Sequence, residues 1–183
     1  AALPPGVRVF LRPFPARLLH RAWACGDRPA AEWLTGRVDV FHATNFVLPP
    51  VRRPRGVVTI HDLSFLRFPE MVDSASLSYR TLVPKAVSAA AAVITVSHAM
   101  AEEIAAELGV PEERIVVTEL GVDESWFEPA PAPVGIPADY LLAVGTLEPR
   151  QGLDVLLDAY RDPLVAGPAP PPLVLVGASG WGP

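Results

Sequence analysis

Cysteine is almost absent from this sequence. Cys25 is the single cysteine among 183 residues, which excludes an intrachain disulfide and a cluster of thiolates around a metal. The count also fits a reducing compartment. The four histidines are dispersed, so no group of residues has the spacing of a metal site. No serine, histidine and aspartate are spaced as a hydrolytic triad, so we expect neither a metal nor that kind of nucleophile.

Long apolar runs are missing as well. One uncharged run, rich in alanine, covers residues 86–101 and is broken by serine, threonine and histidine. A membrane-spanning helix needs about 20 apolar residues, so this run is too short. The first residues, AALPP, lack the basic start and the apolar run of a signal peptide. We therefore expect a soluble, cytoplasmic protein.

The sequence has no broad excess of positive charge. Its net charge is −5, and its lysine and arginine residues are scattered. A nucleic-acid partner would require a basic face, so we expect no nucleic acid among the partners. One short basic cluster places Arg52, Arg53 and Arg55 close together. This cluster is either a solvated loop or a contact with anionic lipid headgroups, and the residues alone leave both interpretations open.

Half of the residues are hydrophobic, and they form strand-like and helix-like segments in alternation. The predicted strands cover residues 7–11, 39–43, 57–61, 92–96, 114–118, 140–144 and 173–176. The predicted helices cover residues 13–24, 30–34, 76–91, 98–108 and 152–160. This alternation is typical of a parallel sheet with right-handed crossovers. Residues 63–71 are predicted to be a loop, and Pro84 to kink or end its helix.

A change of composition divides the chain. Residues 128–137, EPAPAPVGIP, are predicted to form a stiff proline-rich linker. The same pattern occurs on both sides, so we predict an N-terminal domain over residues 1–127 and the start of a second over residues 138–183. The strands near 39–43, 57–61, 93–96 and 115–118 should be parallel neighbours in one sheet, with 140–144 and 173–176 in another.

Residues 140–152, YLLAVGTLEPRQG, have the order of a strand buried on both faces, a tight loop and a helix. Gly145 ends the apolar run, where the backbone turns or lets a ligand approach closely. A helix that begins after a strand offers unpaired N–H groups to a phosphate, and Arg150 could bind a diphosphate through two hydrogen bonds. The alternative is a plain connection in which Arg150 pairs with Glu148.

Residues 144–150, VGTLEPR, together with Gly152 resemble the retaining glycosyltransferases of family 4, which have the GT-B fold. The resemblance extends from about Val38 to Trp181. It implies an α/β protein with a Rossmann-like, doubly wound parallel sheet and the start of a second Rossmann-like domain. It also implies a donor-phosphate site formed by Gly145, Thr146, Glu148, Arg150, Gln151 and Gly152. Family members usually have lysine at the position of Gln151.

Polar residues at the ends of predicted strands are candidates for the rest of the site. His61 and Asp62 stand at the carboxyl end of a strand, where ligands of open parallel sheets bind. A histidine there could donate a hydrogen bond to a sugar or phosphate, or move a proton. The resemblance implies that His61 and Asp62 are catalytic, and that His42 and Ser97 lie on the acceptor side.

Each of these four residues also has a purely structural interpretation. Asp62 could cap the turn that follows it, and Ser97 could be the N-cap of the helix predicted over residues 98–108. His61 and His42 could be buried residues whose hydrogen bonds are satisfied inside the core. The residues alone do not decide between these roles and a role in a site.

The function implied by the resemblance is transfer of a hexose, with mannose as a candidate. The donor would be a nucleotide diphosphate sugar, the acceptor a glycan or a lipid-linked glycan, and the product would retain the anomeric configuration. No metal or other cofactor is implied, because the sugar nucleotide is a substrate. A lipid-linked acceptor implies peripheral contact with the inner face of the membrane. The alternatives are a non-catalytic or truncated relic that acts as a binding or scaffold module, and a GT-B sugar-nucleotide epimerase.

The resemblance covers only the middle of the family's length. The opening strand with its glycine-rich loop and most of the second domain have no counterpart in residues 1–183. The family's paired-glutamate motif for the donor sugar would lie beyond Pro183. We therefore expect a fragment, a partly ordered protein or a truncated gene product, and whether it is active alone stays open.

Overall fold

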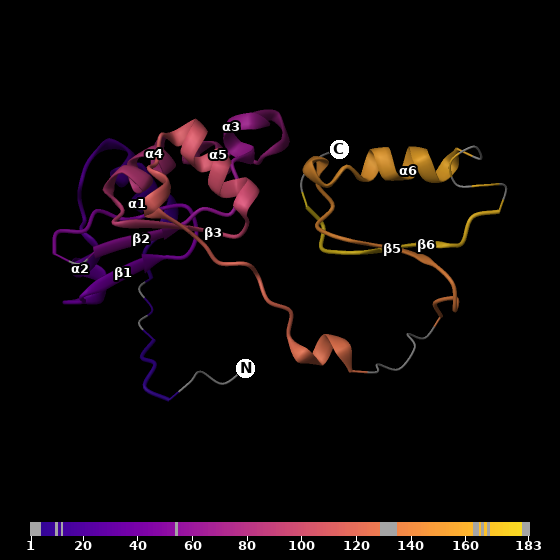
Figure 1. Ribbon diagram of the computed structural model, residues 1–183, viewed down its shortest axis with the longest axis horizontal. Coiled ribbons are helices and arrows are strands. Elements are labelled where there is room, and N and C mark those ends of the chain that lie inside the picture. Colours follow the sequence, from indigo (N-terminus) through magenta and orange to yellow (C-terminus); the bar gives the residue numbers. More distant parts are fainter. Residues whose placement is uncertain are drawn as a thin grey trace. The chain divides into compact units, whose positions relative to one another are not determined.

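The computed structural model describes residues 5–9, 11, 13–53, 55–128, 135–162, 165, 167 and 169–180. Contacts within the chain divide it into two compact units, residues 1–69 with 74–120 and residues 70–73 with 121–183. Each unit contains its own parallel sheet (Figure 1). No helix among the described residues combines the length and the apolar character that crossing a membrane requires.

The first unit is a mixed α/β unit. Its strands are β1 (Val40–Ala43), β2 (Arg55–Thr59), β3 (Ala92–Thr95) and β4 (Ile115–Val117). Its helices are α1 (Ala16–Cys25), α2 (Ala31–Thr35), α3 (Ser64–Arg67), α4 (Tyr79–Ala89) and α5 (His98–Leu108). Short 3₁₀ turns occur at Pro69–Met71, Ser76–Ser78 and Glu112–Arg114.

The four strands of the first unit form one parallel sheet in the order β1-β2-β3-β4. Val57 of β2 is paired with His42 of β1 on one side and with Ala92 of β3 on the other. The predicted neighbours and their parallel direction are confirmed. β2 covers residues 55–59 rather than 57–61, so His61 lies beyond the strand and not at its last position.

The two faces of this sheet differ in burial. Strands that follow chain order and are joined by right-handed crossovers have all their connections on one face. On that face Val58 and Val93 are 0% exposed, and Figure 1 shows α1, α4 and α5 on the same side of the strands. On the other face Val40 is 56% and Val116 47% exposed. The core of the first unit therefore lies between the sheet and its helices.

Helix α1 packs against α4 through a small apolar cluster. Leu19 and Trp23 of α1 are buried together with Leu82 of α4. The Lys85 ammonium of α4 donates to the backbone oxygens of Trp23 and Ala24, which lie in the last turn of α1. A cation there stabilises the negative end of the helix dipole. The exposed Cys25 follows as the last residue of α1.

Helix α5 has the ends that its sequence predicts. The Ser97 hydroxyl accepts a hydrogen bond from the Met100 N–H at 3.2 Å, which is N-cap geometry. Gly109 ends the helix in the left-handed conformation, with φ 63°. Ile104 is fully buried and fixes the helix to the sheet side of the unit. The structural interpretation of Ser97 is confirmed.

Two local predictions are wrong, and a third is narrowed. The described residues among 7–11 form no strand, because they have no neighbouring strand with which to exchange backbone hydrogen bonds. The predicted loop 63–71 contains α3, because Asp62 caps its first turn and Phe65 is buried. Helix α4 does not end at Pro84, since Leu82, Val83, Ala86 and Val87 on both sides of the proline pack into the core. The kink that was the other possibility at Pro84 stays a prediction.

The second unit contains β5 (Leu141–Val144) and β6 (Leu173–Val176), which pair in parallel. It also contains 3₁₀ turns at Glu124–Phe127 and Pro149–Gln151, and helix α6 (Leu153–Arg161), which lies along one side of the strands (Figure 1). The prediction that the 140–144 strand is buried on both faces is wrong, because Leu142 is 54% and Val144 71% exposed. One helix covers only one face of the pair.

Within the predicted linker 128–137, residues 129–134 lie outside the described residues, and the predicted domain boundaries stay a prediction.

The cap of α5 can be tested by substitution. Ser97→Ala removes the acceptor of the Met100 N–H, so we expect the free energy of unfolding to fall by about 1 kcal/mol. Ser88→Ala is the matched control, because Ser88 is exposed inside α4, where alanine is a good helix former. Urea denaturation of both variants measures the difference. Equal stabilities of the two variants would mean that the Ser97 hydroxyl is not needed by the helix.

Candidate active site

Polar residues gather at the carboxyl edge of the first sheet. Because β1 to β4 are parallel, the residues that follow them come to the same edge. Thr44 follows β1, His61 follows β2, Ser97 follows β3 and Glu119 follows β4. Ligands of open parallel sheets bind at this edge. The candidate site is therefore built by four neighbouring loops of one unit.

The backbone before His61 is held by two hydrogen bonds to β3. The Ile60 N–H donates to the Ile94 carbonyl at 2.9 Å. The Ile60 carbonyl accepts from the Thr95 hydroxyl at 2.9 Å, and Thr95 is fully buried. A buried hydrogen bond of this kind fixes the direction in which the chain leaves β2. His61 is consequently presented from a rigid position, although it lies outside the strand.

The imidazole of His61 is oriented by a backbone carbonyl. Its Nε2 lies 3.0 Å from the Thr44 oxygen. A carbonyl oxygen can only accept, so Nε2 carries the hydrogen and Nδ1 is the acceptor nitrogen of the neutral ring. Such a ring can accept a hydrogen bond or a proton from a sugar hydroxyl. His61 is half-buried at the sheet edge, so its interpretation as a core residue is wrong.

Phe46 supports His61 and was not predicted. Its ring is 5.8 Å from the His61 ring and is stacked on Tyr79 at 4.8 Å, measured between ring centroids. Its backbone has φ 56°, which costs a non-glycine residue energy and is frequent near functional sites. The hydrogen bond from the Phe46 N–H to the Thr59 oxygen at 3.0 Å maintains this conformation. No pattern in the sequence indicates a left-handed phenylalanine.

Asp62 caps the turn that follows it, as its structural interpretation predicts. Its Oδ1 accepts from the Ser64 N–H at 2.9 Å and from the Ser64 hydroxyl at 2.5 Å. This carboxylate therefore fixes the start of α3, directly after His61. A catalytic role of Asp62 stays a prediction.

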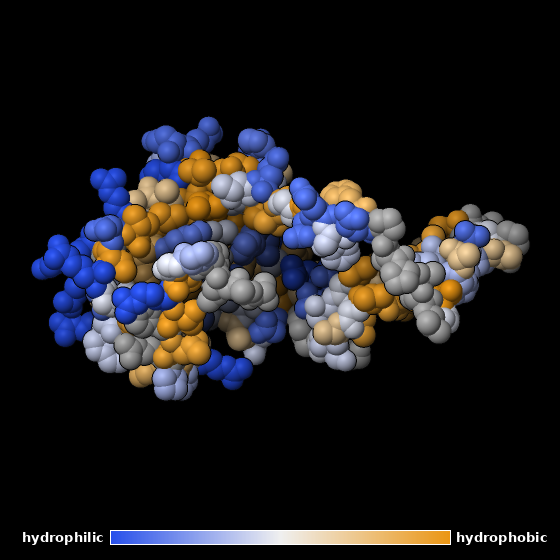
Figure 2. Space-filling view, turned by 90° about the horizontal axis from the view of Figure 1, so that it is seen from below, coloured by the Kyte–Doolittle hydropathy of each residue, from blue (hydrophilic) through white to orange (hydrophobic). Residues whose placement is uncertain are grey.

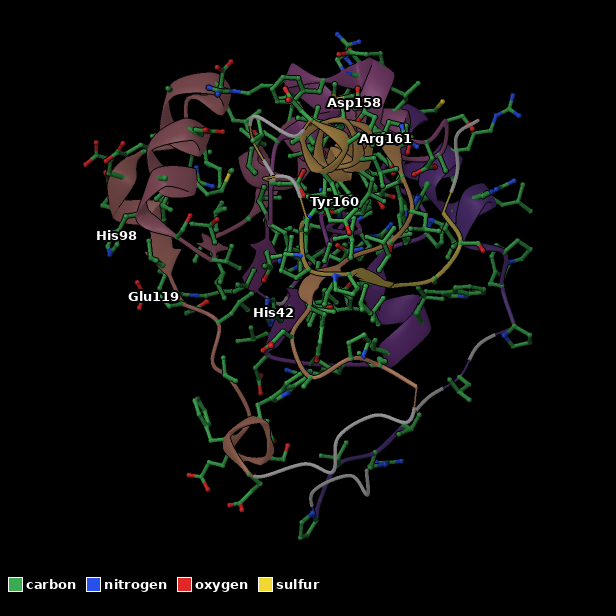
Figure 3. All side chains as sticks on the ribbon, turned by 90° about the vertical axis from the view of Figure 1, so that its right-hand side faces the viewer. His42, His98, Glu119, Asp158, Tyr160 and Arg161 are labelled. Atoms are coloured by element: carbon green, nitrogen blue, oxygen red, sulfur yellow. The ribbon has the colours of Figure 1, made fainter. Side chains whose placement is uncertain are left out.

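His42 lies on the exposed face of the sheet and not in the core, so its core interpretation is wrong. Its Nε2 is 2.9 Å from the Thr59 hydroxyl on the neighbouring strand. His42 and His61 thus both connect the ends of β1 and β2, and the structure brings these two predicted residues to one region. Figure 3 labels His42 there, His98 at the start of α5 and Glu119 on the segment after β4. Glu119 has no sequence signal beyond its place after a strand.

The predicted donor residues lie in the loop after β5 and in the turn that follows. Thr146 is within this loop, and the Gly145 N–H donates to the Val176 oxygen at 2.9 Å. The Gln151 side chain lies over Gly145, since a Cβ on Gly145 would be 3.1 Å from the Gln151 Oε1. Directly after β6, a Cβ on Gly177 would be only 1.8 Å from the Gly145 oxygen. Two backbones therefore meet closely at the edge where the loop begins.

Arg150 forms an ion pair with Glu148, as its structural interpretation predicts. Its Nη2 and Nε donate to the Glu148 Oε1 at 3.0 and 3.2 Å. Helix α6 begins at Leu153, one residue later than predicted, because Gly152 is left-handed with φ 62°. Among the described residues, no three histidine, cysteine, aspartate or glutamate side chains are grouped so as to hold a metal ion.

Comparison with known proteins identifies the family to which this chain belongs. The family model described as Glycosyltransferase Family 4 matches residues 2–126. The chain belongs to glycosyltransferase family 4. The family predicted from residues 144–152 and from the strand ends is thus confirmed, and so is the Rossmann-like parallel sheet.

A curated relative extends the likeness beyond the first unit. The chain is similar to the O-antigen chain mannosyltransferase B of Escherichia coli, with 31% identity over 178 residues. The alignment covers 90% of this chain and 44% of that protein. The chain therefore spans less than half the length of this relative.

The hydrogen bond from the buried Thr95 to the Ile60 carbonyl, directly before His61, can be tested by substitution. Thr95→Val keeps the shape of the side chain but leaves the Ile60 carbonyl without its donor, so unfolding should become easier by about 1–3 kcal/mol. Thr118→Val is the matched control, because Thr118 is exposed just beyond β4. Denaturant unfolding of the two variants compares them. If Thr95→Val is as stable as the control, the hydroxyl does not hold the end of β2.

Proposed function

We propose that this family 4 protein transfers a hexose from a nucleotide diphosphate sugar to a glycan or lipid-linked acceptor, with retention. The observation that carries the proposal is the fixed His61 at the carboxyl edge of a sheet in a chain of this family. Mannose is the first sugar to test, because the relative is named an O-antigen chain mannosyltransferase. The proposal includes no cofactor.

The first unit would form the acceptor side of the site. His61 would accept a hydrogen bond from a sugar hydroxyl through Nδ1, because Nε2 is engaged with Thr44. Asp62 would keep His61 in place through the turn at Ser64. His42 and Ser97 lie at or next to the same edge and would contact the acceptor from β1 and from the start of α5. The acceptor would thus be bound by loops from three parallel strands.

The second unit would bind the diphosphate of the donor. Developing negative charge on a leaving diphosphate requires donors that are already in place. Arg150 can supply two of them, because its ion pair with Glu148 is partly exposed and such pairs contribute only about 0–1 kcal/mol. A diphosphate, with more charge than one carboxylate, would displace Glu148. Gly145, Thr146 and Gly152 would let the phosphates approach the backbone.

The place of action in this proposal is the cytoplasm, with peripheral contact at the inner face of the membrane when the acceptor is lipid-linked. The two alternatives predict different products. A non-catalytic binding module releases no nucleoside diphosphate, and an epimerase acts on the sugar nucleotide without an acceptor. An assay of nucleoside diphosphate release and of the sugar nucleotide, with and without acceptor, distinguishes the transferase, the binding module and the epimerase.

His61 is the residue to test for transfer. In a preparation with transferase activity, His61→Ala should abolish transfer while the melting temperature stays within a few degrees, because the lost hydrogen bond is at the exposed sheet edge. Release of nucleoside diphosphate from a panel of sugar nucleotides, with and without acceptor, measures this. His20→Ala on α1 is the control and should keep activity. Transfer at the parental rate by His61→Ala would remove His61 from the site.

Gln151 generates a prediction for the donor side. A charge-assisted hydrogen bond contributes roughly 1.5–3 kcal/mol, against about 0.5–1.5 for a neutral one. In a preparation that binds a nucleoside diphosphate, Gln151→Lys should therefore bind it about tenfold more tightly, since 1.4 kcal/mol is tenfold. The gain should shrink in high salt because it is ionic.

Calorimetric titration with a nucleoside diphosphate at low and high salt tests this. Gln151→Glu is the matched control and should bind more weakly than the parent, because it adds a negative charge at the same place. Equal affinities of the three proteins would mean that residue 151 does not face the phosphates.

A further inference from the structure

A cavity lies at the amino edge of the first sheet. Its volume is about 710 Å³, and it is lined by residues 28–30, 32–33, 36–38 and 52–53. Val38 precedes β1 and Arg53 precedes β2, so the cavity is at the end of the strands opposite to His61. It is therefore separate from the candidate active site.

Positive charge is concentrated around this cavity. Four exposed arginines line it together with a single carboxylate, that of Glu32: these arginines are Arg28, Arg37, Arg52 and Arg53. Within the part of the chain that the structure describes, no salt bridge joins their guanidinium groups to a carboxylate. The Glu32 Oε1 accepts instead from the Arg52 and Arg53 backbone N–H groups, both at 2.9 Å. The loop is thus fixed by its main chain, and its side chains are left for an anionic partner.

A smaller apolar cavity adjoins this cationic cavity. It has a volume of about 390 Å³ and is lined by Pro13, Phe14, Trp33 and Leu34. Trp33 belongs to both cavities, is 65% exposed and meets Phe14 edge-on at 6.3 Å between ring centroids. Figure 2 shows hydrophilic and hydrophobic atoms side by side on the first unit. Arginine and tryptophan are the residues most enriched among those that dominate protein–protein binding energies, so this surface suits a protein partner.

The chain itself contains a segment of the opposite charge. Residues 119–128, ELGVDESWFE, follow β4 and include four carboxylates and no basic residue. The carboxylates are those of Glu119, Asp123, Glu124 and Glu128, and within the described residues they form no salt bridge. In the same segment the side chains of residues 126 and 127, a tryptophan and a phenylalanine, are 80% and 79% exposed. The acidic segment therefore has the charge and the apolar groups that the two cavities lack.

Local hydrogen bonds hold the acidic segment in one conformation. Glu124–Phe127 form a 3₁₀ turn, in which the Asp123 Oδ1 accepts from the Ser125 N–H at 2.9 Å. The Trp126 N–H donates to the Asp123 carbonyl at 3.0 Å. These bonds present the two aromatic side chains on a formed turn. A partner that binds them therefore pays little for ordering the segment.

We propose that the acidic segment of one copy of the chain docks into the cationic and apolar cavities of a second copy. Arginine and carboxylate groups pair through two parallel hydrogen bonds, which matches the four arginines to the four carboxylates. The exposed aromatic rings of the segment would be buried beside Trp33. The segment follows the carboxyl end of β4, whereas the cavities lie at the amino edge, so different surfaces of the two copies meet. Such a contact joins copies head to tail. It does not depend on the transferase proposal, since it uses none of the donor or acceptor residues.

Sedimentation velocity of the 183-residue chain over a concentration series tests the proposal. The mean sedimentation coefficient of the parent should rise with concentration, and the rise should shrink in high salt. Arg52→Glu with Arg53→Glu places like charges in contact with the segment, so it should weaken association roughly a hundredfold or more. Glu124→Arg with Glu128→Arg should do the same from the other side. Thermal melts establish that both double variants are folded.

Mixing the two charge-reversed variants provides the decisive measurement. In an equimolar mixture each acidic segment meets an arginine cavity and each basic segment meets an acidic one. Association should therefore return in the mixture, although each variant alone stays monomeric. General loss of structure in either variant would not give this rescue. Two folded variants that stay monomeric when mixed would overturn the proposal.

The control variant is Arg17→Glu with Arg21→Glu, which changes the net charge by the same amount at exposed positions on α1. It should associate as the parent does. Equal loss of association in this control would show that net charge alone governs the assembly, and would overturn the specific contact. A parent that is monomeric at every concentration, or charge-reversed variants that associate alone as the parent does, would overturn it as well.

Discussion

The parallel pairing of β2 with β3 is the constraint on which the first unit depends. It places Val58 beside Val93 at the centre of the core, and beyond the last pair it continues as hydrogen bonds from the Ile60 N–H and to the Ile60 carbonyl. Because all four strands follow chain order, their connections lie on one face and their carboxyl ends at one edge. The same pairing therefore produces both the core and the place of the candidate site.

The fold was largely predictable, because its signals are local. Short β-branched runs and helical spacing identify the strands and helices, and the serine and glycine that bound α5 are typical helix ends. The error at residues 7–11 arises because a strand depends on a non-local contact. It needs a neighbouring strand, and the β-propensity of a segment does not show whether that neighbour exists. Pro84 stayed inside a helix because burial of its neighbours outweighs one lost hydrogen bond.

The candidate site was predictable only in part. The place of His61 after a strand follows from the sequence, but its partner, the Thr44 carbonyl, is on a loop 17 residues away. The left-handed backbone of Phe46 and the hydroxyl of Thr95 also act through contacts distant in sequence. A cavity at the amino edge of the first sheet is a similar case. A basic run at Arg52 and Arg53 is visible in the sequence, but these residues line a cavity only because α2 brings Trp33 and Glu32 to them.

The end of helix α1 has a practical consequence. Cys25 is exposed, and it is the single thiol of the chain. It stands three residues before Arg28, which lines the cavity at the amino edge of the first sheet. A maleimide dye can therefore be attached at one defined point beside that cavity without any substitution. The sequence thus supplies one attachment point for a spectroscopic reporter, and depolarisation of such a dye would report motion at the end of α1.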